Sequence, residues 1–199
     1  MLSEKELLQI EIKADLFLKK YAKYIKGKPY ALDIDAILKK LKFEQATFDK
    51  PEHVRGYLLI NNDKRQIAVN SNFQENARRF TKGHEIGHYM LEFTKLNLDL
   101  KRSPFLSYNT ENCGSTKCVE EQSADFFSAC IFAPRRKFAD KVLEFARNDE
   151  NRKLFSQSIT KFADAIIDFL ADTFLIPRSS AIKRCEELKI AVIPQYATR

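Results

Sequence analysis

The five residues His84-Glu85-Ile86-Gly87-His88 are the most informative stretch of the chain. On a helix, residues four apart project from the same face, one turn above the other. Two imidazoles in that arrangement can bind one tetrahedral zinc ion. Glu85 directly follows the first histidine, so it can reach a water molecule at the metal and act as general base without being a ligand. The spacing therefore predicts a zinc-dependent hydrolytic site with ligands His84 and His88 and catalytic residue Glu85.

The competing interpretation is an ordinary helix that carries two solvated or core histidines. The chain contains only 3 histidines, and two of them fall in this pattern, which makes coincidence a poor explanation. Gly87 also argues against it, because glycine inside a helix costs about 1 kcal/mol relative to alanine. That cost is understandable if another part of the protein must approach the helix closely. A buried Glu85 would need a partner as well, and a metal with its water supplies one.

A catalytic zinc needs a third protein ligand and an open fourth position. His53 precedes the predicted middle strand and has no helical partner. The later segment Glu120–Pro134 is apolar on one side and carries Glu121 and Asp125 four residues apart, on a shared face. We expect Glu121 to be the third ligand and Asp125 to hydrogen-bond the outer nitrogen of a ligating histidine. For Glu120 we expect only a favourable interaction with the helix macrodipole.

The hydrophobic pattern predicts an α+β fold: a mainly helical single domain over residues 1–199, with a small antiparallel three-stranded sheet before the zinc helix. An N-terminal helix over Glu4–Ile25 should bury Leu7, Leu8, Ile12, Leu16, Tyr21 and Ile25, and a short helix from Ile34 to Leu41 should be capped by Asp33. Strands are expected at 43–48, 55–60 and 65–70, and only helices after Gln74, at 74–93, 119–132, 135–147, 152–175 and 179–189. The expected segments are an N-terminal helix (1–30), the sheet (43–70), the zinc-site helices (74–134) and the C-terminal helices (135–199).

The composition, with 44% hydrophobic and 31% charged residues, is that of a globular protein. The N-terminus carries charges from its fourth residue and no stretch approaches 18 apolar residues, so we expect neither a signal peptide nor a membrane span, and a cytoplasmic location. Cys130 and Cys185 should be reduced core residues. Cys113 and Cys118 flank a polar loop, where ordinary thiols are the simpler interpretation and a second metal or a redox switch is the alternative.

The formal net charge of +7 comes from scattered Lys and Arg residues rather than one dense block. A Lys-rich solvated surface explains this pattern, and direct nucleic-acid binding is a minor hypothesis. The segment from Ser179 has the outline of a helix-turn-helix, but the helical spacing of Ile182, Cys185 and Leu188 favours packing onto the body.

Two segments of the chain resemble those of a known family. Arg79-Phe-Thr-Lys-Gly-His-Glu-Ile-Gly-His-Tyr-Met-Leu91 is similar to the signature segment of the ImmA/IrrE metallopeptidases, and Glu121-Gln-Ser-Ala-Asp-Phe-Phe-Ser-Ala-Cys-Ile-Phe-Ala-Pro134 to their second signature. The resemblance implies a gluzincin-like zinc site with ligands His84, His88 and Glu121 and catalytic Glu85. Ser128 replaces the usual alanine, and Lys82-Gly83 replaces a more apolar pair.

The resemblance also implies a role: a zinc endopeptidase that cleaves a regulatory protein, often a helix-turn-helix repressor of a mobile element or stress response. The alternative is a zinc-stabilised, non-proteolytic regulator that binds a repressor or DNA. Glu85 favours catalysis, because a structural zinc site needs no general base. The donor that would stabilise the oxyanion is left open among Tyr89, Tyr108, His53 and Arg79, and the oligomeric state is left open too.

Overall fold

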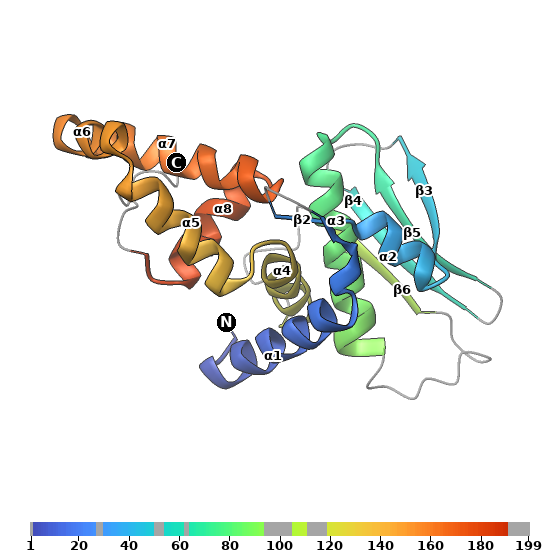
Figure 1. Cartoon of the computed structure of the whole chain (residues 1–199). Helices are drawn as coiled ribbons and strands as arrows, with labels where there is room; N and C mark the ends of the chain where they lie inside the picture. The colour runs from blue at the N-terminus through green and yellow to red at the C-terminus, as the bar shows by residue number, and fades with distance from the viewer. Residues whose placement is uncertain are drawn as a thin grey trace.

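The computed structural model describes residues 2–26, 30–49, 54–61, 64–93, 105–110 and 119–190. The fold is α+β and mainly helical, as predicted (Figure 1). The helices are α1 (Glu4–Lys20), α2 (Ile34–Lys40), α3 (Glu75–His88), α4 (Val119–Phe132), α5 (Arg135–Arg147), α6 (Asp149–Gln157), α7 (Ile159–Phe174) and α8 (Arg178–Glu187). The strands are β1 (Ile25–Lys26), β2 (Ala31–Leu32), β3 (Glu44–Phe48), β4 (Val54–Ile60), β5 (Arg65–Asn70) and β6 (Phe105–Thr110), with a 3-10 turn at Ala22–Tyr24 and a π-helical turn at Tyr89–Phe93.

The main sheet has the strand order β3-β5-β4-β6. The antiparallel β4–β5 hairpin agrees with the predicted meander, with Leu58 opposite Ile67. The other two pairings differ from it. β3 runs parallel to β5, with Ala46 opposite Ala68, and β6 adds a fourth strand antiparallel to β4. The expectation of helices alone after Gln74 was therefore wrong, because β6 returns to the sheet after α3.

α3 lies between the main sheet on one side and helices α1 and α4–α8 on the other, whereas α2 lies on the side of the sheet (Figure 1). Its sheet-facing side packs on β4 and β5, and its other side packs on α4. α1 covers α4 from below in this view, and helices α5–α8 form the left-hand part of the molecule. The helix that carries the two histidines is consequently central and has protein on both sides.

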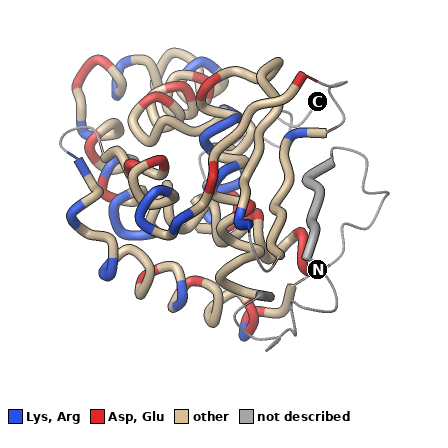
Figure 2. Tube along the Cα trace, turned by 90° about the vertical axis from the view of Figure 1, so that its right-hand side faces the viewer, with Lys and Arg blue, Asp and Glu red and all other residues tan. Residues whose placement is uncertain are grey.

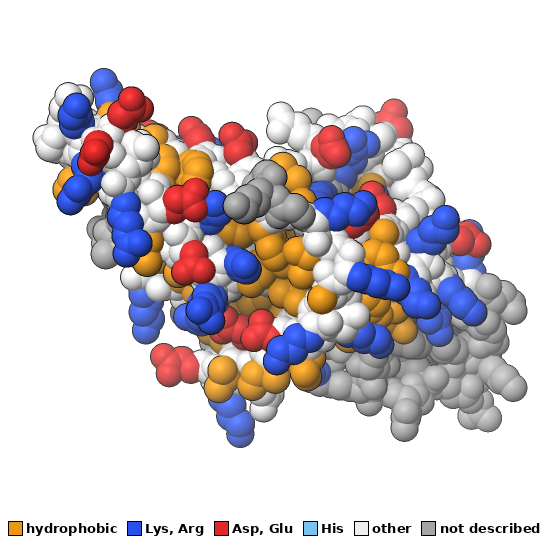
Figure 3. Space-filling model, viewed as in Figure 1, with side chains coloured by type: hydrophobic (Ala, Val, Ile, Leu, Met, Phe, Trp, Pro, Cys, Tyr) orange, Lys and Arg blue, Asp and Glu red, His pale blue; other side chains and the backbone are white. Residues whose placement is uncertain are grey.

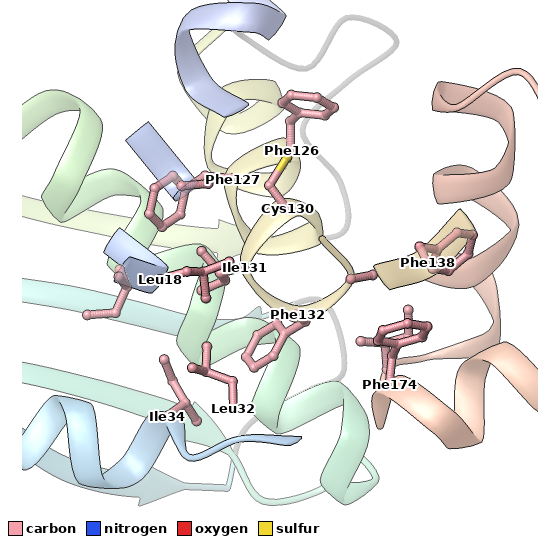
Figure 4. Packing of buried hydrophobic residues seen from close by; sticks show 14 of the residues in the cluster. Leu18, Leu32, Ile34, Phe126, Phe127, Cys130, Ile131, Phe132, Phe138 and Phe174 are labelled. Atoms are coloured by element: carbon pink, nitrogen blue, oxygen red, sulfur yellow. The ribbon is translucent and has the colours of Figure 1, made fainter. Parts of the chain in front are cut away.

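The core is rich in phenylalanine and centres on α4. Phe127, Ile131 and Phe132 are fully buried, and Figure 4 shows the side chains of α4 spread towards α1, β2 and the C-terminal helices. Phe138 and Phe174 pack with tilted rings at a centroid distance of 5.3 Å and extend this core into α5 and α7. Cys130 and Cys185 are buried in it, as predicted from their apolar surroundings.

The predicted face and length of the N-terminal helix were wrong. α1 ends at Lys20, and Ile25 already belongs to β1, which pairs with β2. The helix buries Ile10, Ala14, Phe17 and Leu18 rather than the predicted Leu8, Ile12 and Leu16. Those three side chains are exposed, and Figure 3 shows hydrophobic side chains along the lower edge of the molecule, where α1 lies. α1 thus has two apolar faces. The face that carries the small residue Ala14 and Phe17 is the one that packs on α4.

The predicted helix 152–175 is two helices. Ser158 has an extended backbone and its hydroxyl accepts a hydrogen bond from the backbone N–H of Lys161, so it begins α7 as an N-cap. Asn148 begins α6 in the same way. Asp33 caps α2 as predicted, since its Oδ1 accepts the N–H of Ala36 at 3.0 Å.

Charged residues of both signs are interspersed over the described elements (Figure 2). This agrees with the scattered positive charge seen in the sequence. No helix in the described ranges is long and apolar enough to cross a membrane.

Candidate metal centre

α3 presents both histidines on one buried face. His84 and His88 are 0% and 1% exposed. Their rings meet edge to face at a centroid distance of 4.7 Å, and their Nε2 atoms are 2.9 Å apart. The helical spacing therefore brings the same nitrogen of each ring to one point.

α4 brings a carboxylate to that point. Glu121 Oε2 lies 3.2 Å from His84 Nε2, and Oε1 lies 3.1 Å from His88 Nε2. Three ligands of one tetrahedral zinc ion, each about 2.0–2.1 Å from it, lie about 3.3 Å from one another. The observed separations of 2.9–3.2 Å are close to this. The three side chains consequently fit a tetrahedral metal ion, and their ligand atoms all lie within 4.8 Å of one another.

Asp125 lies one turn after Glu121 and supports His84. Its Oδ1 is 2.8 Å from His84 Nδ1. A neutral His84 that donates its Nδ1–H to Asp125 keeps the lone pair of Nε2 for a metal, which is the usual arrangement of a ligating histidine. The sequence prediction for Asp125 agrees with this contact.

The electrostatics of the cluster favour negative charge on Glu121. Burial alone would raise the pKa of Glu121, but its hydrogen bonds with His84 and His88 hold that pKa at about 2. Burial alone would lower the pKa of His84, yet contacts with Asp125 and Glu121 raise it above its usual value in the metal-free protein. The cluster of His84, His88 and Glu121 therefore favours the binding of a cation, either a proton or a metal ion.

Close packing of α3 on α4 positions these groups. A Cβ at Gly87 would lie 2.9 Å from Ala124 Cα and 3.0 Å from Ala124 O, so α4 could not come as near. The close approach that Gly87 suggested in the sequence is therefore made by the backbone of α4.

The neighbouring Gly83 leaves room for side chains of α4. A Cβ there would lie 2.7 Å from Ser128 Oγ, which donates to the Phe80 carbonyl at 2.9 Å. Gly83 and Ser128 are two of the departures from the family signatures, and they adjoin in space.

Glu85 lies on a different side of α3, against the sheet, and is fully buried. The point where a Gly56 Cβ would sit is 3.5 Å from Glu85 Oε1 and 2.5 Å from Thr81 Cγ2. Gly56 therefore makes room for the α3 face that carries Glu85. Gly56 was not among the predicted site residues, although a glycine inside an apolar strand was an available signal.

Two of the four candidates for stabilising an oxyanion have other contacts. Arg79 donates to the carbonyls of Phe174, Leu175 and Leu32 at 2.7–3.1 Å, so it holds segments together. The Tyr89 hydroxyl accepts from Arg65 at 3.5 Å, and the Tyr89 ring packs edge to face against another ring beside the sheet. His53, Cys113 and Cys118 lie outside the described residues, as does the side chain of Tyr108.

Residues 39–186 match the family model of the IrrE N-terminal-like domain, Peptidase_M78. The chain belongs to this peptidase family. No curated protein matches the chain. Membership in the IrrE N-terminal-like family supports a metallopeptidase role and a protein substrate, and the cluster of His84, His88 and Glu121 is a group that could hold its metal.

Proposed function

We propose that this IrrE N-terminal-like protein is a zinc-dependent endopeptidase, with zinc held by His84, His88 and Glu121 and with Glu85 as general base. The observation that carries this proposal is that two imidazole nitrogens and one carboxylate converge at 2.9–3.2 Å from one another. Glu85 directly follows the first of these histidines in the chain. Two imidazoles and one carboxylate suit zinc better than calcium or magnesium, which prefer oxygen ligands.

The residues of the site have separate roles in the proposed reaction. Bound zinc would polarise the scissile carbonyl and make a water molecule more acidic. Glu85 takes a proton from the attacking water and passes it to the leaving amine. Asp125 keeps His84 in the tautomer that binds metal. The burial of His84, Glu85 and His88 keeps bulk water away from this chemistry.

The proposed substrate is a specific regulatory protein, namely a helix-turn-helix transcriptional repressor of a mobile element or stress response. Family membership and the resemblance of the two signature segments support it. Such a repressor acts in the cytoplasm, so we propose that location too, with the chain working as a single domain.

The test uses Glu85→Gln, which keeps the size of the side chain and removes its basicity. Purified zinc-loaded wild type and Glu85→Gln are incubated with repressors encoded beside the gene, with and without chelator. We expect wild type to produce one cut that chelator abolishes, and Glu85→Gln to bind zinc and repressor but to cleave about 10²–10⁴-fold more slowly.

Undiminished cleavage by zinc-loaded Glu85→Gln would refute the mechanism. If wild type and variant both bind the repressor and both leave it intact, the protein is the alternative, a zinc-stabilised regulator without peptidase activity.

A further inference from the structure

Asp125 has a second charged neighbour that comes from a helix remote in sequence. Its Oδ1 faces His84, while its Oδ2 lies 3.7 Å from Lys183 Nζ on α8. The Asp125 side chain is 15% exposed and that of Lys183 is 52% exposed. The two oxygens of one carboxylate therefore connect α8 to the histidine that faces the metal position.

α8 is fixed at this place by the residue next to Lys183. The fully buried Arg184 donates from Nε to the Ala133 carbonyl, just after α4, at 3.0 Å. It also pairs with Glu187 at 3.1 Å. The part of α8 next to Lys183 is thus tied to the end of α4, the helix that carries Asp125 and Glu121.

A second carboxylate near Asp125, that of Glu187, makes the positive charge of Lys183 favourable at this place. Burial raises the pKa of Glu187, and Asp125 acts in the same direction, whereas Arg184 and Lys183 oppose it. Asp125 and Glu187 therefore repel each other in a partly buried place, and the Lys183 ammonium offsets that repulsion.

We propose that Lys183 is a positioning residue of the metal centre, which acts by holding the Asp125 carboxylate in the orientation that fixes His84. This inference rests on the proposed zinc site. It makes α8 part of that site, although α8 contributes no ligand.

The expected effect on zinc affinity has two opposing parts. A lysine near the centre repels a dication through space, so its removal favours zinc binding. Removal also frees Asp125, which weakens zinc binding. The through-space repulsion persists when Asp125 is replaced by asparagine, whereas the ion pair does not. A double-mutant cycle therefore separates the two parts.

The experiment measures the zinc dissociation constant by chelator competition for wild type, Lys183→Met, Asp125→Asn and the double variant of the full chain. Lys161→Met, on the exposed side of α7, is the matched control. We expect Lys183→Met to change the zinc dissociation constant by different factors in the two backgrounds. The dissociation constant of the variant divided by that of its parent should be roughly 2- to 5-fold larger in the wild-type background than in the Asp125→Asn background. Lys183→Arg should restore the wild-type constant, and Lys161→Met should change neither background.

An equal effect of Lys183→Met in both backgrounds would overturn the role of Lys183, while leaving the zinc site intact. Absence of zinc binding by the wild type would instead overturn the zinc site, and the role of Lys183 with it. Lys183→Gln is measured in parallel, with circular dichroism of each metal-free variant, so that a packing effect of methionine is separated from loss of the charge.

Discussion

At the scale of single residues, adjacent glutamates at the start of α4 have different surroundings. Glu121 is 8% exposed and contacts both histidines, whereas Glu120 is exposed to solvent. If Glu121 is a ligand, Glu121→Ala should lose most of the bound zinc, as should His84→Ala or His88→Ala, from an expected content of about one zinc per chain. Glu120→Ala is the control and should keep it.

Metal content after dialysis, measured by atomic emission, decides between these outcomes. Loss of zinc in Glu120→Ala together with retention in Glu121→Ala would mean that the register of α4 at the centre is wrong.

The residues of the candidate centre could be predicted because their spacing is local to a helix. His84 and His88 share a face by helical geometry alone, and so do Glu121 and Asp125. The two pairs meet because α3 packs on α4. Gly87 indicated that some segment approaches α3 closely, but not that this segment is α4. The position of Lys183 beside Asp125 could not be predicted, since no local sequence pattern indicates that α8 packs near α4.

At the scale of helices, the packing of α3 on α4 makes a testable demand at Gly87. Gly87→Ala would place a methyl group 2.9 Å from Ala124 Cα, so the helices must separate. We expect a loss of about 1–3 kcal/mol in the free energy of unfolding, partly offset by the better helix propensity of alanine. Zinc affinity should also fall, because Glu121 lies one turn before Ala124.

A second substitution makes this prediction sharper. Ala124→Gly would remove only the Ala124 Cβ contact at 3.2 Å and leave the two shorter backbone contacts. The double variant should therefore bind zinc as poorly as Gly87→Ala. Full recovery of the zinc dissociation constant in the double variant would show that side-chain contact, rather than backbone approach, sets the helix spacing.

Helix bounds were predicted well where a strong local signal marks the end of a helix. α4 and α5 begin and end as the sequence indicated, because Pro134 separates them. α1 offers two apolar faces, and only tertiary contact with α4 selects one. The break at Ser158 was missed because the apolar pattern continues across it. Parallel pairing of β3 with β5 depends on the path of the chain and not on local pattern.

At the scale of the whole molecule, Arg79 connects α3 with the C-terminal helices. Its guanidinium donates to carbonyls of β2 and of the C-terminal end of α7, and it lies 4.3 Å from the centroid of the Phe132 ring. Arg79→Met would leave those carbonyls without this donor. We expect a loss of about 3–5 kcal/mol in the free energy of unfolding, measured with urea in excess chelator.

Arg79→Lys should recover little of that stability, since one ammonium cannot replace a planar fork that reaches three carbonyls. Wild-type stability of Arg79→Lys would mean that charge alone matters at this position.

A second long-range contact should make stability depend on pH. The hydrogen bond with Arg135 on α5, at 2.7 Å, lowers the pKa of Glu11 on α1 from 4.5. A lowered folded-state pKa stabilises the protein above the unfolded value and loses that effect as pH falls through the folded value. Glu11→Gln should therefore cost up to about 1 kcal/mol at pH 7, and the difference from wild type should shrink below pH 4.5. Urea unfolding of both proteins from pH 3 to 7 measures it, and a constant difference would contradict the prediction.

The contact between α3 and α4 also limits how the gene can change in length. Glu121, Ala124, Ser128 and Phe132 meet α3 along one line of α4. Insertion of one codon between Glu121 and Ala124 would turn Glu121 by about 100° relative to the residues that hold the helix in place. The carboxylate would then face away from His84 and His88, although every residue type is still present. The interval between the glutamate and the small residues is therefore a better criterion than the histidine motif alone for recognising metal-competent chains among related genes.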